Sequence, residues 1–410
     1  MITVMSKKNI FLTVLILFWC AFTLCPLNIS NAASGNLPRI GVWITVFSEE
    51  KVLYSKESID RLIGICGETG INDIYVQIYR ANKAYYDSDI TDRTAYETIL
   101  SEAGEDTLAY LIGKAKNNNL NIYAWINLLS IAANEDAGVL KKFGKDILTR
   151  DQYGRTARQG DKKDELDKYY IRENQLFLEP GDSRVREYLT DIAEEIAGKY
   201  PGLTGLHFDY VRYPAAVPFI PGSRFTSHGI SYGYTEANIK NFKNATGLDV
   251  ETMEYSRENS RLWDGWRRKQ VNALLRDISE HIRALAPSMK ISCTVVPSIE
   301  RTYLSTFQDW TGWLRKGYVD YVVAMNYTDD TALMELNSSS LLLPGLDKKV
   351  HIGIGAYLLK DKPETLKDQL KSLRELSPSG IVIFSYDEIA RDEEIRKYLS
   401  DNFRTAPPLS

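Results

Sequence analysis

Eight runs of apolar, β-branched or aromatic residues recur along the chain, and this recurrence constrains the fold more than any other feature. The runs span residues 39–47, 73–79, 120–128, 204–213, 289–296, 319–327, 350–357 and 380–386. Helical patterns rather than tight turns lie between successive runs, such as the stripe Val185, Leu189, Ile192 and Ile196 that follows a capping Asp182. Strands that alternate with helices predict a parallel sheet, and eight such units predict a closed (β/α)8 TIM barrel.

An open doubly wound sheet is the competing architecture. Such folds usually carry a glycine-rich phosphate loop after the first strand. Residues 43–48 read Trp-Ile-Thr-Val-Phe-Ser and contain no glycine. The sequence therefore favours the barrel.

Two long connections interrupt the regular spacing of the runs. Residues 129–177 are charged and weakly periodic, and residues 215–256 are rich in Pro, Gly and Tyr. In a barrel both would follow strands three and four at the C-terminal face, where active-site loops lie. We interpret them as a cover over one side of a cleft, and decorative surface insertions are the alternative.

The first residues have the three-part plan of a secretory signal. Lys7 and Lys8 precede an apolar run over 10–24, and small residues follow over 30–34. Cleavage after Ala32 or Ala33 would make residues 1–32 a signal peptide and residues 33–410 a single domain with no transmembrane anchor. We expect a protein that is secreted or held in the periplasm or cell envelope. An uncleaved anchor is the alternative, although the run is short for a bilayer span.

Charge, cysteine and histidine content limit the classes of partner and cofactor that the sequence implies. The formal net charge is −4 and no long basic run is present, so neither nucleic acid nor an anionic membrane is implied. Signal cleavage would leave only Cys66 and Cys293, which we expect to be buried thiols. The histidines show no metal-ligand spacing, so we expect neither metal nor cofactor. We also expect a monomer.

The segment 205–214 carries the strongest chemical signal. Side chains alternate along a strand, so His207 and Asp209 share one face while Leu206 and Phe208 share the other. Pro214 cannot extend a sheet ladder, which places Asp209 near the C-terminal end of the fourth strand. A structural partnership with His207 or Arg212 is the alternative role for Asp209.

Aromatic rings and amides dominate the strand ends that would converge on the barrel mouth. The candidate ligand-binding residues among them are Trp43, Gln77, Tyr79, Trp125, Asn127, His207, Arg212, Asn326, Tyr327, Tyr357 and Tyr386. Rings stack on the C–H faces of sugars, while amides and charged groups hydrogen-bond hydroxyls, so this set suits a carbohydrate cleft. Ordinary core packing is the alternative for each ring.

Glycosidic cleavage usually needs two carboxyl groups. Asp209 is the first candidate, and Asp387 and Asp329 are the next two. Weaker candidates, which also lie near strand ends, are Asp330, Glu388, Glu300 and Glu179. Each of these acidic residues could equally cap a helix or face solvent.

The segment 205–214 closely resembles the G-[LI]-H-F-D-Y-[IV]-R-Y-P signature of the bacterial glycosyl-hydrolase-like family 10. Further matches lie at 39–43, 123–125, 179–186 and 263–268. The resemblance implies a (β/α)8 hydrolase of glycans such as peptidoglycan strands or exopolysaccharide, with Asp209 as catalytic carboxylate and His207, Arg212 and Tyr213 in the site.

Residues 325–328 are also similar to the Met-x-Tyr-Asp of family 18 chitinases, with Thr328 in place of the aspartate. That similarity implies that Asn326 or Tyr327 would hold a substrate acetamide acting as internal nucleophile. The absence of a D-x-x-D-x-D-x-E run on the fourth strand argues against this version.

We therefore expect an exported glycoside hydrolase that cleaves O-glycosidic bonds of a cell-envelope or extracellular polysaccharide by carboxylate acid/base catalysis. The alternative is a glycan-binding envelope protein without turnover on the same barrel.

Overall fold

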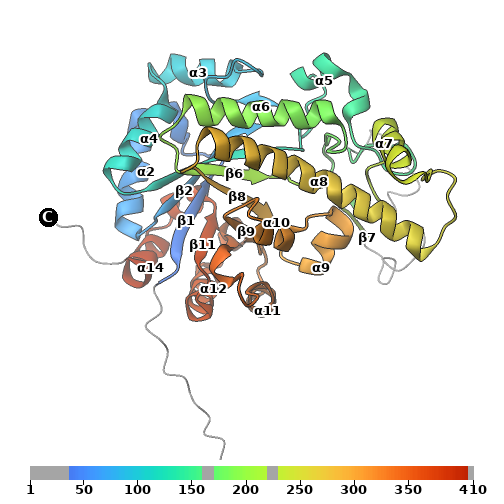
Figure 1. Cartoon of the computed structure of the whole chain (residues 1–410). Helices are drawn as coiled ribbons and strands as arrows, with labels where there is room; N and C mark the ends of the chain where they lie inside the picture. Colours follow the sequence, from blue (N-terminus) through green and yellow to red (C-terminus); the bar gives the residue numbers. More distant parts are fainter. Residues whose placement is uncertain (1–36, 159–169, 219–229, 405–410) are drawn as a thin grey trace, which may run out of the picture. The chain divides into compact units, whose positions relative to one another are not determined.

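The computed structural model describes residues 37–158, 170–218 and 230–404, which lie within one compact unit, Leu37–Ser410. Eight parallel strands form its centre (Figure 1). They are β1 (Arg39–Ile44), β2 (Asp73–Arg80), β4 (Asn121–Asn127), β6 (Gly205–Asp209), β8 (Lys290–Val295), β9 (Tyr321–Met325), β10 (Val350–Gly355) and β11 (Gly380–Phe384). Because β1 pairs with both β11 and β2, the sheet closes. The predicted (β/α)8 barrel is confirmed, and each predicted run contains one strand.

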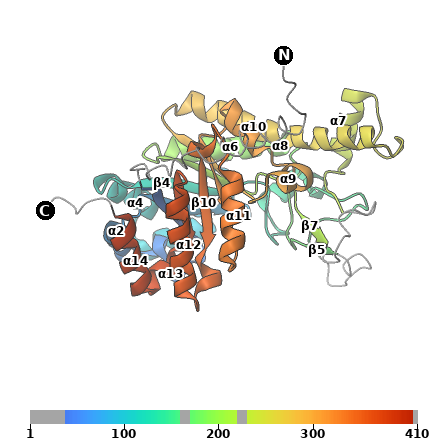
Figure 2. The ribbon, with the colours of Figure 1, turned by 90° about the horizontal axis from the view of Figure 1, so that it is seen from below.

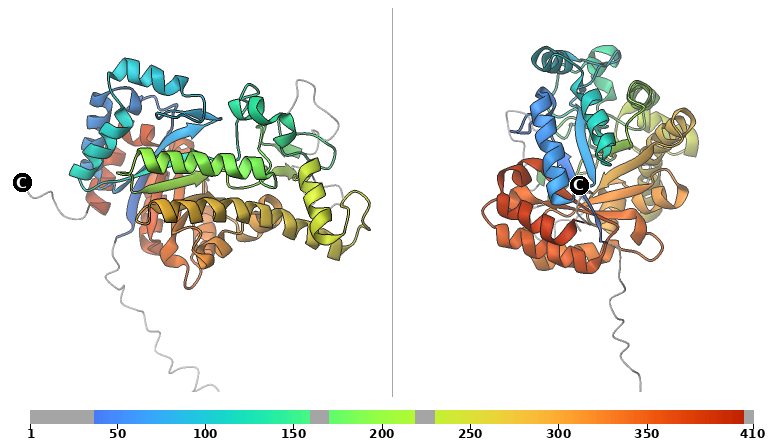
Figure 3. Two further views of the ribbon diagram at one scale, coloured as in Figure 1. Left: turned by 45° about the horizontal axis from the view of Figure 1, so that its top comes forward. Right: turned by 90° about the vertical axis from the view of Figure 1, so that its left-hand side faces the viewer.

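Helices surround the strands, as the right-hand view of Figure 3 shows. The longer ones are α2 (Lys56–Thr69), α3 (Thr94–Ala103), α4 (Thr107–Asn117), α6 (Ser183–Lys199), α7 (Glu236–Thr246), α8 (Arg257–Leu285), α11 (Thr331–Leu341), α12 (Pro363–Leu376) and α14 (Glu393–Phe403). The shorter elements are α5 (Gly138–Phe143), α9 (Ile299–Arg301), α10 (Trp310–Lys316), α13 (Tyr386–Arg391), η1 (Val52–Tyr54), η2 (Lys145–Ile147), η5 (Thr302–Thr306), η6 (Asp347–Lys349), η7 (Ala356–Leu359) and the hairpin strand β3 (Lys83–Ala84).

Local sequence sets where these helices start and stop. The Asp182 carboxylate accepts a hydrogen bond from the Arg184 amide at 2.9 Å and caps α6, as predicted. Helix α2 ends at Gly70, which adopts the left-handed φ of 75° that glycine tolerates best. Helix α8 ends at Leu285, two residues before Pro287.

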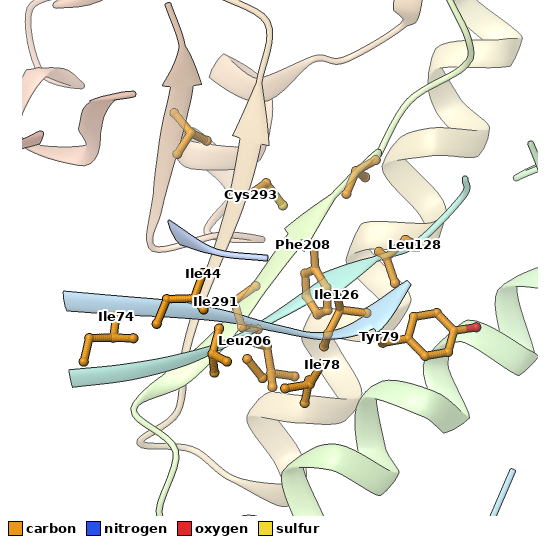
Figure 4. Close-up of a cluster of buried hydrophobic side chains, with 14 of the residues drawn as sticks. Ile44, Ile74, Ile78, Tyr79, Ile126, Leu128, Leu206, Phe208, Ile291 and Cys293 are labelled. Atoms are coloured by element: carbon orange, nitrogen blue, oxygen red, sulfur yellow. The ribbon is translucent and has the colours of Figure 1, made fainter. Parts of the chain in front are cut away.

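Side-chain alternation divides the core into two parts. Outward-facing residues such as Ile126, Leu206 and Phe208 pack between the strands and the helices (Figure 4). The inward-facing cluster is mostly aromatic and consists of Trp43, Tyr75, Tyr123, Trp125, Tyr321, Val323 and Val382. Barrel interiors are usually filled by Val, Ile and Leu, so this interior is unusually rich in rings.

A glycine on β10 makes room for the largest of these rings. A Cβ atom at Gly353 would lie 2.8 Å from Cη2 of Trp43 and 3.2 Å from the carbonyl oxygen of Ala324. A side chain there would have to displace the indole or the backbone. The central position of Trp43 therefore depends on a glycine two strands away in the sheet order.

The two long segments do follow the third and fourth barrel strands, β4 and β6. Strand β5 (Tyr170–Arg172) from the first segment pairs antiparallel with β7 (Ala216–Pro218) from the second, and Figure 2 shows the two strands side by side. The guanidinium of Arg212, just before the second segment, also pairs with the Glu173 carboxylate of the first. The segments are thus tied together at the C-terminal end of β6.

The predicted signal peptide, residues 1–32, lies outside the described residues. Within the described ranges, no helix is long and apolar enough to span a membrane. Cys66 and Cys293 are both buried free thiols, as predicted.

Candidate active site at the barrel mouth

Four inward-facing polar side chains lie on neighbouring strands near their C-terminal ends. Gln77, Asn127, Asp209 and Thr294 come from β2, β4, β6 and β8, and we name them the polar row. The Gln77 amide donates to Asn127 Oδ1 at 3.2 Å, and Thr294 Oγ1 donates to Asp209 Oδ1 at 2.5 Å. Asn127 and Asp209 are register partners in the β4–β6 ladder, so their side chains leave adjacent strands in the same direction. The row therefore consists of two hydrogen-bonded pairs on four adjacent strands, which make up half of the barrel.

Asp209 is the ionisable member of the polar row. Its side chain is buried, and burial raises the pKa of its carboxyl above the usual value of 3.8. Hydrogen bonds from Thr294 and from the Tyr210 amide, at 2.7 Å, oppose that rise, and both bonds reach Oδ1. Neither of these two bonds reaches Oδ2, and the indole of Trp125 is a third donor that lowers the pKa of the carboxyl. The second oxygen is therefore held by neither Thr294 nor the Tyr210 amide.

The alternative structural roles for Asp209 receive no support from its contacts. The predicted partners were His207 and Arg212, yet among the described residues neither forms a hydrogen bond or ion pair with Asp209. Arg212 only helps to lower the pKa of Asp209 from a distance. The strand end thus presents an acid whose hydrogen bonds position it without neutralising it.

Trp125 lies two residues before Asn127 on β4, so it faces the same side of the strand but lies deeper in the barrel. Its indole N–H is buried and has no hydrogen-bond acceptor among the described residues. The indole nevertheless points its donor toward Asp209, where it is the smallest of the named influences that lower the pKa of that carboxyl. This N–H is therefore a donor beside the candidate acid that has no well-formed hydrogen bond of its own.

Aromatic rings occupy the opposite half of the mouth. Tyr327 and Phe384 stack with centroids 5.7 Å apart, and Tyr357 meets Phe384 edge-on at 5.6 Å. We name these three residues the aromatic patch. Strand β11, which carries Phe384, is diametrically opposite β6 in the barrel order. The ring of Tyr357 is 42% exposed, so the patch is open to a ligand.

Trp43 and His207 form the floor between the two halves. Trp43 is 1% exposed, and its Nε1 donates to Nε2 of the fully buried His207 at 3.1 Å. His207 Nδ1 lies 2.8 Å from Ser292 Oγ. Burial, assisted by His351, lowers the pKa of His207 to about 3, so the ring is neutral. Since Nε2 accepts, the proton is assigned to Nδ1, and His207 supports the floor instead of contacting a ligand.

Arg212 and Tyr213 connect the mouth to the long segments. Arg212 Nη2 donates to Glu173 Oε2 at 3.0 Å, and Glu173 also accepts from the Ala215 amide at 2.7 Å. Tyr213 is 1% exposed and its hydroxyl donates to the fully buried Glu179. Tyr213 is thus a buried support for the site. Glu173 was missed by the sequence analysis because its partner becomes visible only when β5 pairs with β7.

Three predicted ligand-binding residues point away from the mouth. Tyr79 lies in the outer core (Figure 4) because the β2–β4 ladder shifts register between Gln77 and Tyr79, which turns Tyr79 outward. Asn326 follows the inward Met325 and donates instead to the carbonyl of Met334 on α11 at 2.8 Å. Asn326 is therefore not placed to hold an acetamide, whereas Tyr327 is in the aromatic patch.

Tyr386 is the third residue that points away. The strand β11 ends at Phe384, and Tyr386 is already the first residue of α13, so strand alternation no longer applies to it. Its ring is buried in the outer core near Cys66 of α2.

The two candidates for a second catalytic carboxylate, Asp329 and Asp387, are engaged by side chains outside the polar row. Asp329 is exposed and its Oδ2 lies 2.8 Å from Nζ of Lys362, which lowers the pKa of Asp329, the wrong direction for a proton donor. Asp387 accepts a hydrogen bond from Ser48 Oγ at 2.5 Å and so anchors the loop after β1. Both residues have structural partners that the sequence did not reveal.

Three of the four weaker acidic candidates, Asp330, Glu388 and Glu179, also have structural partners. Asp330 caps α11, and Glu388 completes the capping box of α13 with Ser385. Burial raises the pKa of Glu179, whose oxygens are occupied by Tyr213, Thr149 and the Gly181 amide. No group of three or more His, Cys, Asp or Glu residues in the described part of the chain could hold a metal ion.

A (β/α)8 barrel whose mouth sets a buried carboxylic acid opposite a patch of aromatic rings has the features of the glycoside hydrolase class. The chain belongs to the glycosyl hydrolase-like 10 family, whose model matches residues 39–350. The predicted family and enzyme class are confirmed.

Curated relatives carry the same class name. Glycosyl hydrolase YngK of Bacillus subtilis is 23% identical over 385 residues, which cover 86% of this chain and 68% of that protein. Glycosyl hydrolase DigH of Escherichia coli K12 is 20% identical over 276 residues, which cover 63% of this chain and 55% of that protein. The chain thus spans about two thirds of the first relative's length and about half of the second's.

Solved structures show the same fold at low sequence identity. The glycoside hydrolase domain of PgaB (BpsB) from Bordetella bronchiseptica has a TM-score of 0.64 at 12% identity, covering 90% of this chain and 99% of that domain. The catalytic domain of β-amylase from Paenibacillus polymyxa has a TM-score of 0.55 at 11% identity, covering 90% and 98%.

Proposed function

We propose that the protein hydrolyses O-glycosidic bonds of a cell-envelope or extracellular polysaccharide, with Asp209 as the general acid. The observation that carries this proposal is the state of Asp209. It is a buried carboxyl with a raised pKa, held through one oxygen, at the C-terminal end of a barrel strand. Catalytic residues of TIM barrels come from this end, and a general acid needs its proton near the working pH.

The geometry of the mouth suits the chemistry of a glycosidase. Thr294 and the Tyr210 amide hold Oδ1, so a proton on Oδ2 is delivered toward the leaving oxygen of the glycosidic bond. Sugar C–H faces stack on Phe384 and Tyr357, and the Asn127 amide, beside Asp209, hydrogen-bonds hydroxyls. The sugar ring would lie between the two halves, with its scissile bond at Asp209.

The substrate that we propose is an amino-sugar polymer such as the glycan strands of peptidoglycan. The mouth combines neutral amides and aromatic rings with one carboxyl, that of Asp209, in the polar row. This combination suits a largely uncharged sugar ring. The signal-like pattern over residues 1–32 supports export to the compartment where such polymers occur. We further propose that the protein acts as a monomer without a cofactor.

The direct test compares wild type with Asp209→Asn on peptidoglycan strands and on an N-acetylglucosamine polymer, with release of reducing ends as the readout. Loss of a general acid should lower turnover by about 10²–10⁴-fold. The matched control is Asp401→Asn, an exposed aspartate on α14 whose partner is Lys397. Undiminished activity of a correctly folded Asp209→Asn protein would remove Asp209 from the mechanism.

Glycan binding without turnover is the second candidate function. The observation that favours it is the engagement of Asp329 with Lys362 and of Asp387 with Ser48, which leaves neither placed as a second catalytic carboxylate. It predicts that wild type binds these glycans and releases no reducing ends during long incubation. Cleavage that depends on Asp209 would exclude it.

A further inference from the structure

A cavity separate from the barrel mouth lies at the N-terminal half of α8. Its volume is about 170 Å³, and Tyr234, Glu254, Tyr255, Trp263, Asp264 and Arg267 contribute to its walls. We name it the α8 cavity. Helix α7 packs against the same part of α8 through Phe242, whose ring lies 5.0 Å from that of Trp263 (Figure 1). None of these residues belongs to the polar row or the aromatic patch.

The walls of the α8 cavity present aromatic surface. Tyr234 and Trp263 meet edge-on with centroids 5.4 Å apart. Tyr255 is 83% exposed, although it is a large ring that belongs to the cavity wall. An open aromatic side chain at the entrance and buried rings behind it form a surface on which the C–H face of a sugar can stack.

Two buried donors in the cavity wall have no acceptor. Trp263 and Arg267 are 2% and 3% exposed, and neither the indole Nε1 nor the guanidinium Nε has a hydrogen-bond partner among the described residues. The two residues are one helical turn apart on α8, and the guanidinium lies 5.3 Å from the indole ring. Buried donors are normally satisfied, so this pair leaves two hydrogen bonds unmade in the wall of the cavity, which an oxygen-bearing ligand could accept.

Charge narrows the kind of ligand. The Arg267 guanidinium is paired with Asp264 at 2.5 Å and also donates to the carbonyl of Tyr232 at 2.6 Å. Glu254 adds a further carboxylate to the wall. A cavity with one paired cation and an additional carboxylate repels polyanions and accepts hydrogen bonds from hydroxyl and amide N–H groups.

We propose that the α8 cavity is a second saccharide-binding site, which holds a neutral amino-sugar unit of the polymer that is cleaved at Asp209. Tyr255 stacks on the sugar, the indole N–H and guanidinium Nε donate to its oxygens, and Glu254 accepts from it. The sugar class rests on the proposed function.

Packing connects this cavity to the candidate active site. The Arg267 guanidinium lies 4.3 Å from the Phe307 ring, which meets Tyr213 edge-on at 5.6 Å. Tyr213 is four residues beyond Asp209 on the same chain segment. A long polymer would therefore be held at a site that is rigidly connected to the one where it is cleaved, whereas a short oligomer would reach only one of them.

The test measures binding of the N-acetylglucosamine pentamer by titration calorimetry to the full chain carrying Asp209→Asn, so that turnover does not interfere. We expect two sites. Adding Tyr255→Ala should weaken one of them about tenfold and Trp263→Phe, which keeps the ring but removes the N–H, about fivefold. Tyr255→Phe retains the ring and should bind like its parent. Tyr153→Ala, at a 50% exposed tyrosine outside the cavity, is the matched control.

Equal binding by the parent, Tyr255→Ala and Trp263→Phe proteins would overturn the proposal, as would a single site in the parent. Binding of a polygalacturonate oligomer at the Tyr255-dependent site would also overturn it, because the charge argument would be wrong. Failure of the wild-type protein to hydrolyse glycans would contradict the proposed function alone, since the calorimetric result does not depend on turnover.

Discussion

The hydrogen bond between Thr294 and Asp209 gives the sharpest test of the proposed acid. Thr294 is 2% exposed, and its Oγ1 lies 2.5 Å from Asp209 Oδ1, at the short end of the range for a hydroxyl that donates to a carboxylate. Thr294→Val replaces the hydroxyl with a methyl group of similar shape. The Tyr210 amide, at 2.7 Å, still holds the same oxygen.

The size of the effect follows from the kind of bond that is removed. A hydrogen bond to a charged acceptor contributes about 1.5–3 kcal/mol, and it stabilises the ionised carboxylate more than the neutral acid. The bond from Thr294 is the largest of the contacts that lower the pKa of Asp209. Loss of this bond should raise the pKa of Asp209. Because one pKa unit corresponds to about 1.4 kcal/mol, the limb of the pH–activity profile that titrates with Asp209 should move upward by about one to two pH units.

The direction of the shift depends on the form of Asp209 that is active. A general acid is active when protonated, so kcat/KM falls as the pH rises through its pKa. Thr294→Val should therefore extend activity to higher pH. The measurement is kcat/KM on a soluble amino-sugar oligomer between about pH 3 and pH 9. Thr294→Ser keeps the hydroxyl and serves as the control, with the unshifted profile expected.

Two results would refute this reasoning. If the acidic limb moves upward instead, the active form of Asp209 is the ionised carboxylate, and its role is that of a nucleophile or base. If neither limb moves in a folded Thr294→Val protein, Asp209 does not control the profile.

Three further substitutions test the fold around the site. Asp209→Asn should raise Tm relative to wild type above about pH 4, and the gain should grow until the pH has passed the raised pKa of Asp209 and then level off, because ionisation of a carboxyl with a raised folded-state pKa destabilises the wild-type fold; calorimetry from pH 3 to 8 measures this. Gly353→Ala should cost about 1–3 kcal/mol in urea unfolding, because its Cβ would lie 2.8 Å from Trp43. Tyr79→Phe should cost about 1 kcal/mol, since its hydroxyl accepts from Asn82 at 2.9 Å, and should leave kcat/KM within about twofold because the ring faces the outer core.

The barrel could be predicted because its signal is repeated and local. Each strand is a short apolar run, and alternation put Leu206 and Phe208 on one face and His207 and Asp209 on the other. The structure shows that these faces are the outer core and the barrel interior. The same alternation failed at Tyr79, where one extra residue in the ladder reverses the side-chain direction. Register shifts depend on pairing with another strand, and a single strand's sequence does not contain that information.

The partners of charged residues were the second limit of sequence reasoning. Asp329 and Asp387 both follow barrel strands, as a catalytic carboxylate would, and only tertiary structure shows that Lys362 and Ser48 occupy them. Glu173 had no motif, because its role depends on the antiparallel pairing of β5 with β7 and on Arg212. Position along a strand therefore predicts which side chains reach the mouth, but not which of them remain available there.

The unusual aromatic interior accounts for the state of Asp209. Trp43, Trp125 and the neutral His207 fill the space below the polar row and exclude water from it. A carboxylate on such a floor lacks the hydration that it would have in water, so ionisation is unfavourable. Burial is therefore the largest influence on the pKa of Asp209. An ordinary aliphatic floor would bury the carboxyl equally well, but it would offer neither the spare indole N–H of Trp125 nor a ring surface continuous with Phe384, 6.3 Å from the indole. In the proposed reaction the rings would therefore both keep the acid protonated and bind the sugar, which ties the residues of the barrel core to that proposal.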